Sequence, residues 1–227
     1  MAAYAAQRER MVAEVEAMYA ETAAETGLAA MSSAVRAALG KVERHRLVPP
    51  DEASRAYGNF PLPIGAGQTI SQPYIVALST DLIEPRAGQV VLEVGTGSGY
   101  QAAILAEIVG RVYSIEVVAE LGRGAAERLA GLGYTNVEVR VGDGYAGWPK
   151  KAPFDAIVVT AAAPNVPQAL VDQLKPGGRM VIPVGERWGA QDLLLVSKGA
   201  DGRVERKSVL PVRFVPLVHG RPLAGDQ

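Results

Sequence analysis

Helical spacing of apolar residues dominates the first 48 positions of the chain. Between residues 11 and 19, apolar side chains recur every three or four positions, and Gly27 ends the pattern. A second helix is predicted to begin at Ser32 or Ser33. We expect these two helices to form a packing layer. Proline and glycine dominate residues 47–63, which predicts an extended loop.

From residue 85 onward the pattern changes to short apolar runs that alternate with helical segments. The runs read as buried strands, and they cover residues 89–95, 111–116, 136–143, 154–162 and 177–185. Helical segments follow the first, second and fourth of these strands. Such an alternation predicts βαβ units and an α/β fold with a doubly wound, mostly parallel sheet.

The last part of the chain predicts an antiparallel finish to this sheet. Residues 192–210 read as two strands around an Ala-Asp-Gly turn, and residues 212–218 read as a last strand. No internal repeat and no linker between domains stands out, and 227 residues suit one sizeable domain.

The segment "LPIGAGQTISQPYIVA" (62–77) is polar and constrained, because it holds two glycines, two hydroxyls and a glutamine between Pro63 and Pro73. Pro73 suits the first turn of a helix, where its missing N–H costs nothing. Ser71 is then predicted to be the N-cap of that helix. The segment lies upstream of the part of the chain that has the pattern of a cofactor-binding fold.

Composition narrows the chemistry. The chain has no cysteine, which excludes disulfides and thiolate catalysis, and its only histidines are His45 and His219, so we expect no metal site. Its net charge is −1 with acids and bases interspersed, so nucleic acid is not an expected partner. We find no signal-like hydrophobic core and no apolar run long enough to cross a bilayer. We therefore expect a cytoplasmic protein that does not bind membranes.

The segment "VLEVGTGSGYQ" (91–101) is the strongest sign of a cofactor. Glycines at the end of a strand let a ligand approach the backbone, and the usual binding crevice lies there. A dinucleotide fingerprint would place glycine at position 100, but Tyr100 stands there, and acidic Glu93 precedes Gly95. This spacing favours S-adenosylmethionine over NAD, because it offers an acid for a cationic ligand. The alternative is a glycine-rich turn in another kind of α/β enzyme.

Two further strand ends carry ligand-like residues. Glu116 ends the second strand about 20 residues past the glycines, where an acid can bind both ribose hydroxyls. Asp143 and Gly144 end the third strand, where carboxylate and backbone can bind the adenine edge. The structural alternatives are a solvent-facing acid at position 116 and an Asx turn at position 143.

Enzymes that methylate amino groups often carry an amide–proline–aromatic set after the fourth strand. The segment "VVTAAAPNVP" stands there in this chain and lacks such a set, so the sequence gives no sign of an amine as methyl acceptor. Ser98 is not in a nucleophile elbow, since Thr96 takes the place of the first glycine.

The chain resembles the protein-L-isoaspartate O-methyltransferases, which methylate abnormal isoaspartyl residues. The resemblance rests on "RHRLVP" (44–49), "AYGNFPLPIGAGQTISQPYIVA" (56–77), "VLEVGTGSGYQAAILAEIVG" (91–110), "VYSIE" (112–116), "GDG" (142–144), "FDAIVVTAAAP" (154–164), "LKPGGRMVIPVG" (174–185) and "VRFVPL" (212–217). The segment around residues 61–73 discriminates this family, because the glycine motif is common to many methyltransferases. The resemblance implies the seven-stranded sheet of class I methyltransferases, with N-terminal helices and an antiparallel C-terminal strand.

The resemblance also implies a division of one methyltransferase domain, 1–227. Its regions are an N-terminal part (1–60), an active-site loop and helix (61–84), a cofactor-binding core (85–185) and C-terminal strands (186–227). Ser71 is implied as the active-site serine, which orients the substrate carboxylate. The implied cofactor-binding residues are Thr69, Ile70, Ser71, Gln72, Glu93, Gly95, Thr96, Gly97, Ser98, Gly99, Glu116, Asp143 and Gly144.

The expected substrates are isoaspartyl-containing proteins and peptides, the expected product of the cofactor is S-adenosylhomocysteine, and we expect a monomer. Four positions depart from the family pattern, namely Glu43, Asn59 and the neighbouring Val218 and His219. One alternative is a relative that methylates ordinary aspartate in a dedicated peptide partner. The short segment after the last predicted strand argues against it, since such relatives tend to have longer C-termini. A binding module without turnover is the other alternative.

Overall fold

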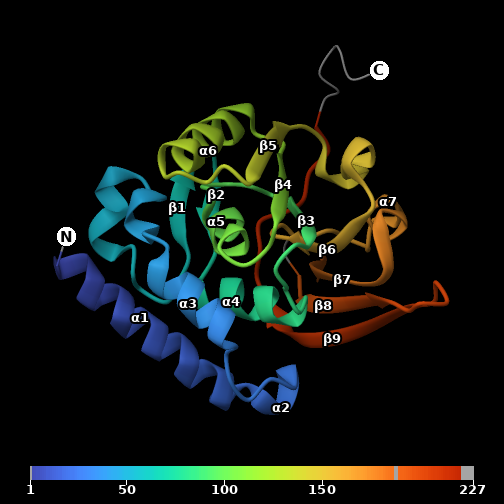
Figure 1. Cartoon of the computed structure of the whole chain (residues 1–227), viewed down its shortest axis with the longest axis horizontal. Coiled ribbons are helices and arrows are strands. Elements are labelled where there is room, and N and C mark those ends of the chain that lie inside the picture. Colours follow the sequence, from blue (N-terminus) through green and yellow to red (C-terminus); the bar gives the residue numbers. More distant parts are fainter. Residues whose placement is uncertain (1, 187–188, 221–227) are drawn as a thin grey trace.

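A seven-stranded sheet forms the centre of the protein. The computed structural model describes residues 2–186 and 189–220 of the chain, and Figure 1 shows their arrangement. The strand order is β5-β4-β3-β6-β7-β8-β9, and the strands from β3 to β7 run parallel while β8 and β9 are antiparallel. The strands are β3 (Val90–Val94), β4 (Arg111–Glu116), β5 (Val137–Val141), β6 (Phe154–Val159), β7 (Leu174–Gly185), β8 (Gln191–Lys198) and β9 (Val204–Val212). The predicted doubly wound sheet is confirmed.

The order of the strands reverses between β3 and β6, because β4 and β5 lie on one side of β3 and β6 to β9 on the other. In open α/β sheets, ligands bind outside the carboxyl ends of the strands at such a switch point. The fold therefore places the expected site at the ends of β3, β4 and β6.

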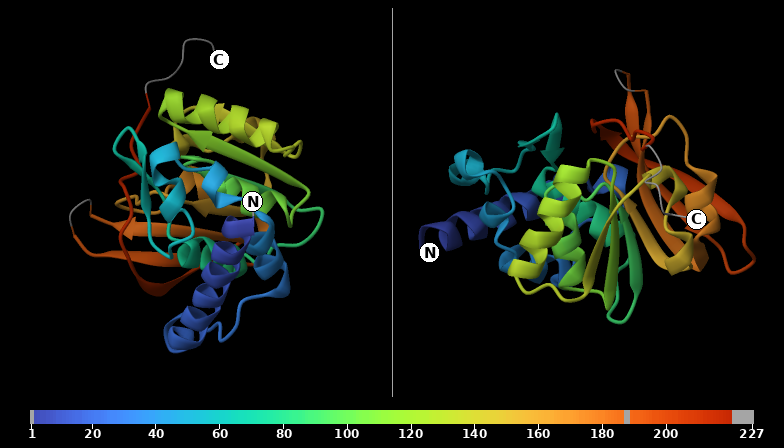
Figure 2. Two further views of the ribbon diagram at one scale, coloured as in Figure 1. Left: turned by 90° about the vertical axis from the view of Figure 1, so that its left-hand side faces the viewer. Right: turned by 90° about the horizontal axis from the view of Figure 1, so that it is seen from above.

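Both faces of the sheet are buried, which explains why its strands read as continuous apolar runs. Val91 of β3 packs on one side with the N-terminal helices, α4 (Pro73–Leu82), α5 (Tyr100–Ala106) and α6 (Ala119–Gly131). Its neighbour Leu92 packs on the other side with α7 (Gln168–Asp172) and Trp148. The right-hand view of Figure 2 shows the N-terminal helices and α5 on one side of the sheet.

The predicted N-terminal helices are confirmed. They are α1 (Ala2–Glu21), the short α2 (Ala23–Thr26) and α3 (Ser33–Lys41). Gly27 ends α2 in the left-handed conformation, at φ 77°, and Ser32 caps α3 by accepting a hydrogen bond from the N–H of Val35. None of the described helices combines the length and hydropathy that a bilayer-spanning helix requires.

The extended loop predicted for residues 47–63 is confirmed only in part, for residues 47–49 and 56–61. The 3₁₀ helix η1 (Arg44–Arg46) precedes this region and η2 (Pro50–Arg55) lies within it, and a hairpin of β1 (Leu62–Gly65) and β2 (Gln68–Ile70) begins at its end. Ala66 and Gly67 both have positive φ in the turn, which is the geometry that two-residue hairpins favour. Further 3₁₀ turns are η3 (Gly144–Ala146) and η4 (Pro149–Lys151).

Ser71 is not the N-cap of α4, so that prediction is wrong. Gln72 holds the cap position, and its side chain makes no capping hydrogen bond. The N–H of Tyr74 is instead satisfied by Oδ1 of Asn59, at 3.0 Å. A side chain fifteen positions upstream thus replaces the local cap, and the Ser71 hydroxyl makes none of the hydrogen bonds found among the described residues.

The last predicted strand, 212–218, is also wrong. β9 ends at Val212, and the chain then crosses the carboxyl edge of the sheet as an extended strap, residues 213–219. The strap makes one isolated parallel bridge with the end of β6, in which the N–H of Leu217 donates to the carbonyl of Ala162 at 2.7 Å. Regular pairing with β8 ends at Val212, opposite Gln191.

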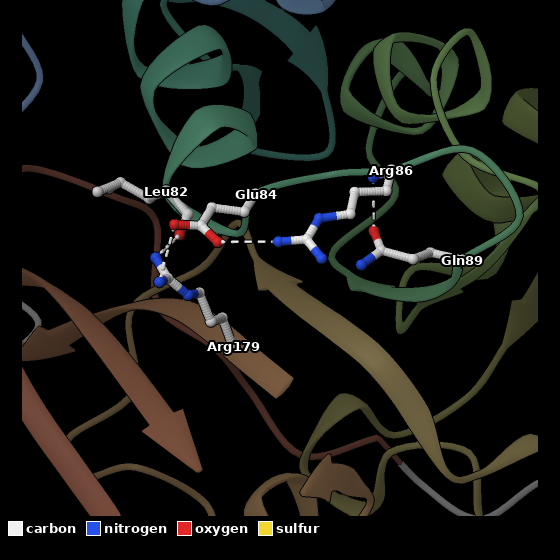
Figure 3. A network of polar contacts seen from close by, with 5 residues as sticks. All are labelled: Leu82, Glu84, Arg86, Gln89 and Arg179. Atoms are coloured by element: carbon white, nitrogen blue, oxygen red, sulfur yellow. Dashed lines mark hydrogen bonds and ion pairs between the residues drawn. The ribbon is translucent and has the colours of Figure 1, made fainter. Parts of the chain in front are cut away.

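The other end of α4 is tied to β7 by Arg179. Its Nη1 donates to the carbonyl of Leu82 at 3.3 Å, and its Nη2 lies 2.8 Å from Oε1 of Glu84 (Figure 3). Glu84 also faces Arg86 at 3.5 Å. Helix α4, which begins within the 62–77 segment, is therefore held at both ends.

Candidate active site at the carboxyl edge of the sheet

The glycine loop between β3 and α5 needs its glycines. Gly95, Gly97 and Gly99 have φ values of 100°, 53° and 95°, which L side chains rarely adopt. A methyl group at Gly95 would lie 2.3 Å from Oγ1 of Thr160, and that hydroxyl donates to the Gly95 carbonyl at 2.6 Å. The loop therefore approaches the end of β6 closely, and Gly95 leaves no room for a side chain there.

Glu116 lies at the end of β4, beside this loop, and is 6% exposed. Its Oε2 accepts from the N–H of Gly97 at 2.7 Å, and its Oε1 accepts from the N–H of Val118 at 2.9 Å. The structural alternative of a solvent-facing acid is thus wrong. The carboxylate also lines the same hollow as Gly95.

Glu93 is fully buried under the loop. Ser114 donates a hydrogen bond to its Oε2, and the hydroxyls of Ser114 and Thr96 lie 2.5 Å apart. Oε1 has no hydrogen-bond partner in the described part of the chain. Burial raises the pKa of Glu93 to about 8; the Ser114 hydrogen bond opposes this and the charge of Glu116 adds to it. Glu93 is therefore a buried acid with one unused oxygen.

Asp143 and Gly144 lie where the third strand end was predicted to bind a ligand. Asp143 caps η3 by accepting from the N–H of Tyr145 at 2.8 Å, so the Asx-turn alternative holds for one of its oxygens. The other oxygen lies 3.0 Å from Nδ1 of His219, whose ring stacks on Tyr145 at 4.0 Å. Gly144 has no room for a side chain, because a methyl group there would lie 2.5 Å from Val94.

Three adjoining hollows surround these residues. The loop hollow is lined by Gln68, Thr69, Val94, Gly95, Gly97, Ile115, Glu116, Val117, Gly144, Thr160, Ala161 and residues 215–218. The deep hollow is lined by Thr69, Ile70, Ser71, Val76, Glu93, Gly95, Thr96, Gly97, Ser98, Tyr100, Gln101 and Thr160. The groove is lined by Met18, Thr22, Pro61, Thr69, Ser71, Gln72, Tyr74, Ile75, Thr160 and residues 210–215.

Shared walls make the three hollows one site. Thr69 and Thr160 line all three, and Ser71 lines both the deep hollow and the groove. Gln72 lines the groove alone, whereas Ile70 and Ser98 line the deep hollow alone. Gly99 stands against Leu129 of α6 and supports the loop from behind.

Sequence reasoning missed four parts of this site. Thr160 was hidden at the end of an apolar strand, and the cap from Asn59 depends on a contact between distant residues. Gln191, which is 3% exposed, accepts from the N–H of Phe214 at 2.7 Å and donates to its carbonyl at 3.3 Å, and so fixes the strap. The strap itself carried a strand-like pattern because its apolar side chains cover the site.

Within the described residues, no group of three or more histidine or acidic side chains comes together as a metal site. His45 stacks on Tyr4 at 4.0 Å, and its Nδ1 lies 2.8 Å from the Tyr57 hydroxyl. This histidine therefore serves the packing of α1 against η1 and Tyr57.

Comparisons with known proteins agree with this geometry. The chain is 57% identical over 211 residues to Protein-L-isoaspartate O-methyltransferase 2 of Polaromonas sp., and the match covers 93% of this chain and all of that protein. It is 57% identical over 216 residues to Protein-L-isoaspartate O-methyltransferase 1 of Cupriavidus necator, covering 95% and 83% of the two chains.

Two solved structures are similar over most of the chain. A structure named protein-L-isoaspartate O-methyltransferase has a TM-score of 0.80 at 29% identity and covers 92% of this chain and 65% of that one. A protein from Plasmodium falciparum, described as an enzyme of this type in complex with S-adenosyl-L-homocysteine, has a TM-score of 0.73 at 26% identity, covering 89% and 98%. The family model for Protein-L-isoaspartate(D-aspartate) O-methyltransferase (PCMT) matches residues 15–222, and the chain belongs to this family.

Proposed function

We propose that this protein transfers a methyl group from S-adenosylmethionine to the free carboxylate of isoaspartyl residues in damaged proteins and peptides. One observation carries the proposal beyond family membership. Ser71 and Thr69 stand in the wall between the groove and the hollows of the glycine loop. A methyl donor on one side and a peptide on the other would meet at this wall.

The residues of the two inner hollows fit the methyl donor. S-adenosylmethionine supplies a methyl group on a positively charged sulfur. Gly95, Gly97 and Gly144 line the loop hollow, and because they carry no side chains a ligand can approach their backbone there. Glu116 offers carboxylate oxygens for ribose hydroxyls, and Asp143 and Gly144 offer groups for the adenine edge. The unused oxygen of Glu93 is an acceptor for the ammonium group of the ligand.

Catalysis requires mainly positioning. The nucleophile is the substrate carboxylate, which is ionised at neutral pH, so no base from the protein is needed. The Ser71 hydroxyl is free to donate a hydrogen bond to that carboxylate, because it caps no helix and has no hydrogen-bond partner among the described residues. Holding oxygen, methyl carbon and sulfur in line, without water, is worth many powers of ten in rate.

We also propose that the chain works as one domain and as a cytoplasmic monomer. The groove combines α1, the β1–β2 hairpin and the strap, so the N-terminal region and the core act together. Few large apolar side chains are exposed in the described part, namely Phe60, Val204 and Val218, which supports a monomer. Light scattering after size-exclusion chromatography tests the monomer.

The decisive experiment uses two synthetic peptides that differ only in isoaspartate against aspartate. Labelled S-adenosylmethionine is the donor, and transfer to the isoaspartyl peptide alone is the expected result. Transfer to the aspartyl peptide would instead favour a relative that methylates ordinary aspartate. Cofactor binding without transfer to either peptide would move the search to a dedicated partner, and absence of cofactor binding in calorimetry would contradict the enzyme altogether.

A further inference from the structure

The groove is almost uncharged. Aliphatic, aromatic and thioether side chains make most of its wall, and its other polar side chains are neutral hydroxyls and one amide. Among the described residues that line it, Arg213 is the only one with a full charge. This arginine will therefore attract acidic side chains of a bound peptide and repel basic ones.

Arg213 has no partner of its own in the described part of the chain. It is exposed, and it makes neither a hydrogen bond nor an ion pair there. Other arginines of the protein do find carboxylates, such as Arg179 with Glu84 and Arg36 with Glu16. The guanidinium of Arg213 therefore remains available to a ligand, and its planar donor fork suits a carboxylate.

The backbone that carries Arg213 is fixed. The next residue, Phe214, is held at both its N–H and its carbonyl by the buried side chain of Gln191. The carbonyl of Val215 then accepts from the N–H of Ala162 at 2.8 Å. The backbone position from which Arg213 extends is therefore set before the substrate arrives, and only its side chain has to be ordered on binding.

One further charge acts on the groove, that of Glu25 on α2, a helix that contacts β9. Burial raises the pKa of Tyr74, and after the opposing Thr22 hydrogen bond the charge of Glu25 raises it further. Glu25 does not line the groove. The full charge in the groove wall is therefore the positive one that the strap carries at Arg213.

We propose that Arg213 makes this enzyme prefer isoaspartyl peptides that carry Asp or Glu next to the isoaspartyl residue. This inference rests on the proposed function. Arg213 acts by pairing with the neighbouring carboxylate, while the isoaspartyl carboxylate itself goes to Ser71. Exposed ion pairs of this kind change binding by roughly two- to five-fold, and complementary charge also speeds encounter.

The test compares isoaspartyl peptides that differ in one neighbouring residue, which is Glu, Gln or Lys. One series varies the residue before the isoaspartyl position and another varies the residue after it. The wild type is expected to give kcat/KM in the order Glu, Gln, Lys in one series, with about two- to five-fold between Glu and Gln. Arg213→Gln should remove the preference, Arg213→Glu should reverse it, and 0.5 M salt should weaken it in the wild type, because the Debye length is then below about 8 Å.

Arg206→Gln is the matched control, because Arg206 is exposed on β9 and does not line the groove. It should keep the wild-type order. An unchanged order in Arg213→Gln would overturn the inference, and so would an equal loss for all three peptides, which would mean that Arg213 binds the isoaspartyl carboxylate. Transfer without preference in the wild type would overturn this inference alone, whereas no transfer to any peptide would overturn the proposed function with it.

Discussion

The carboxylate of Glu116 accepts a hydrogen bond from the backbone N–H of Gly97, with 2.7 Å between Oε2 and nitrogen. The same carboxylate also binds the N–H of Val118 at the start of α6. Each oxygen retains a second lone pair, so Glu116 can hold the loop and still accept from a ligand hydroxyl. Cofactor binding and loop geometry therefore depend on one side chain.

Two replacements of Glu116, compared with each other, separate cofactor binding from loop geometry. Glu116→Ala removes both, and we expect S-adenosylmethionine affinity to fall by about 10- to 100-fold, since hydrogen bonds to a charged group contribute about 1.5–3 kcal/mol. Glu116→Gln keeps one acceptor oxygen for the loop but presents a donor to the ribose, so its affinity should fall while its melting temperature stays closer to the wild type. Calorimetric titration and thermal unfolding measure the two effects. Unchanged affinity in both variants would contradict the ribose assignment.

The strands and the glycine loop could be predicted from the sequence because their signals are local. Val91 and Leu92 alternate between two buried faces, and a parallel sheet with helices on both sides requires this pattern. The glycines at 95, 97 and 99 mark positive φ angles directly.

The parts that were predicted wrongly depend on contacts between distant residues. Ser71 has the local signature of an N-cap, but the side chain of Asn59 accepts the hydrogen bond from the N–H of Tyr74. Asn59 lies outside residues 62–77, so the pattern of that segment cannot predict this contact. The strap after Val212 has the composition of a strand, but Gln191 and Ala162 hold it across the sheet edge. The hairpin at 62–70 is indicated in the sequence by Gly67 in its turn. The prolines and glycines around it are equally typical of a loop, and a loop was predicted for that reason.

Ser71→Ala should lower turnover and leave S-adenosylmethionine affinity within a few-fold. The hydroxyl supports no helix and no loop, so its removal affects only the substrate carboxylate. We expect kcat to fall by about ten-fold, the effect of one charge-assisted hydrogen bond of roughly 1.5 kcal/mol. Steady-state kinetics with the isoaspartyl peptide, beside cofactor titration, provides the check. An equal loss of turnover and cofactor affinity would mean that the serine mainly shapes the segment.

Gly95→Ala should destabilise the protein and abolish measurable cofactor binding. Its positive φ disfavours alanine, and the new methyl group would collide with Oγ1 of Thr160, so the cost is about 2 kcal/mol or more. Gly40→Ala is the matched control, because Gly40 is exposed in α3 with open space around it. The control should gain roughly 0.5–1 kcal/mol. Denaturant unfolding compares the two, and similar stability in both variants would refute the close approach of loop and β6.

Arg179→Ala should release the end of α4. The variant loses the hydrogen bond to the carbonyl of Leu82 and the ion pair with Glu84. Because the guanidinium is partly exposed, we expect the free energy of unfolding to fall by about 1 kcal/mol or less. Arg86→Ala tests the other arginine that faces Glu84. The side chain of Arg86 is 75% exposed and its Nη2 lies 3.5 Å from Oε2 of Glu84, so this variant should have almost no effect. Thermal unfolding of both variants gives the comparison. A larger effect for Arg86 would show that the surface pair, rather than the carbonyl of Leu82, anchors the helix.

Glu93→Gln should change the pH dependence of stability. Folding raises the pKa of this carboxyl from 4.5 to about 8, so between these values the folded protein holds a proton that the unfolded chain has released. The contribution of Glu93 is therefore fully present below about pH 4.5 and is lost as the pH rises through about 8. The variant has no charge to bury, and its melting temperature relative to the wild type should rise from pH 5 to pH 9.

Glu205→Gln, which removes an exposed carboxylate on β9, should show no such trend. A constant difference between Glu93→Gln and the wild type from pH 5 to pH 9 would mean that Glu93 is already ionised in the folded protein. Its unused oxygen would then need a cation before the cofactor arrives, and the described walls of the deep hollow contain none. The pH series thus tests whether the site is built around a neutral acid that becomes charged when a cationic ligand enters.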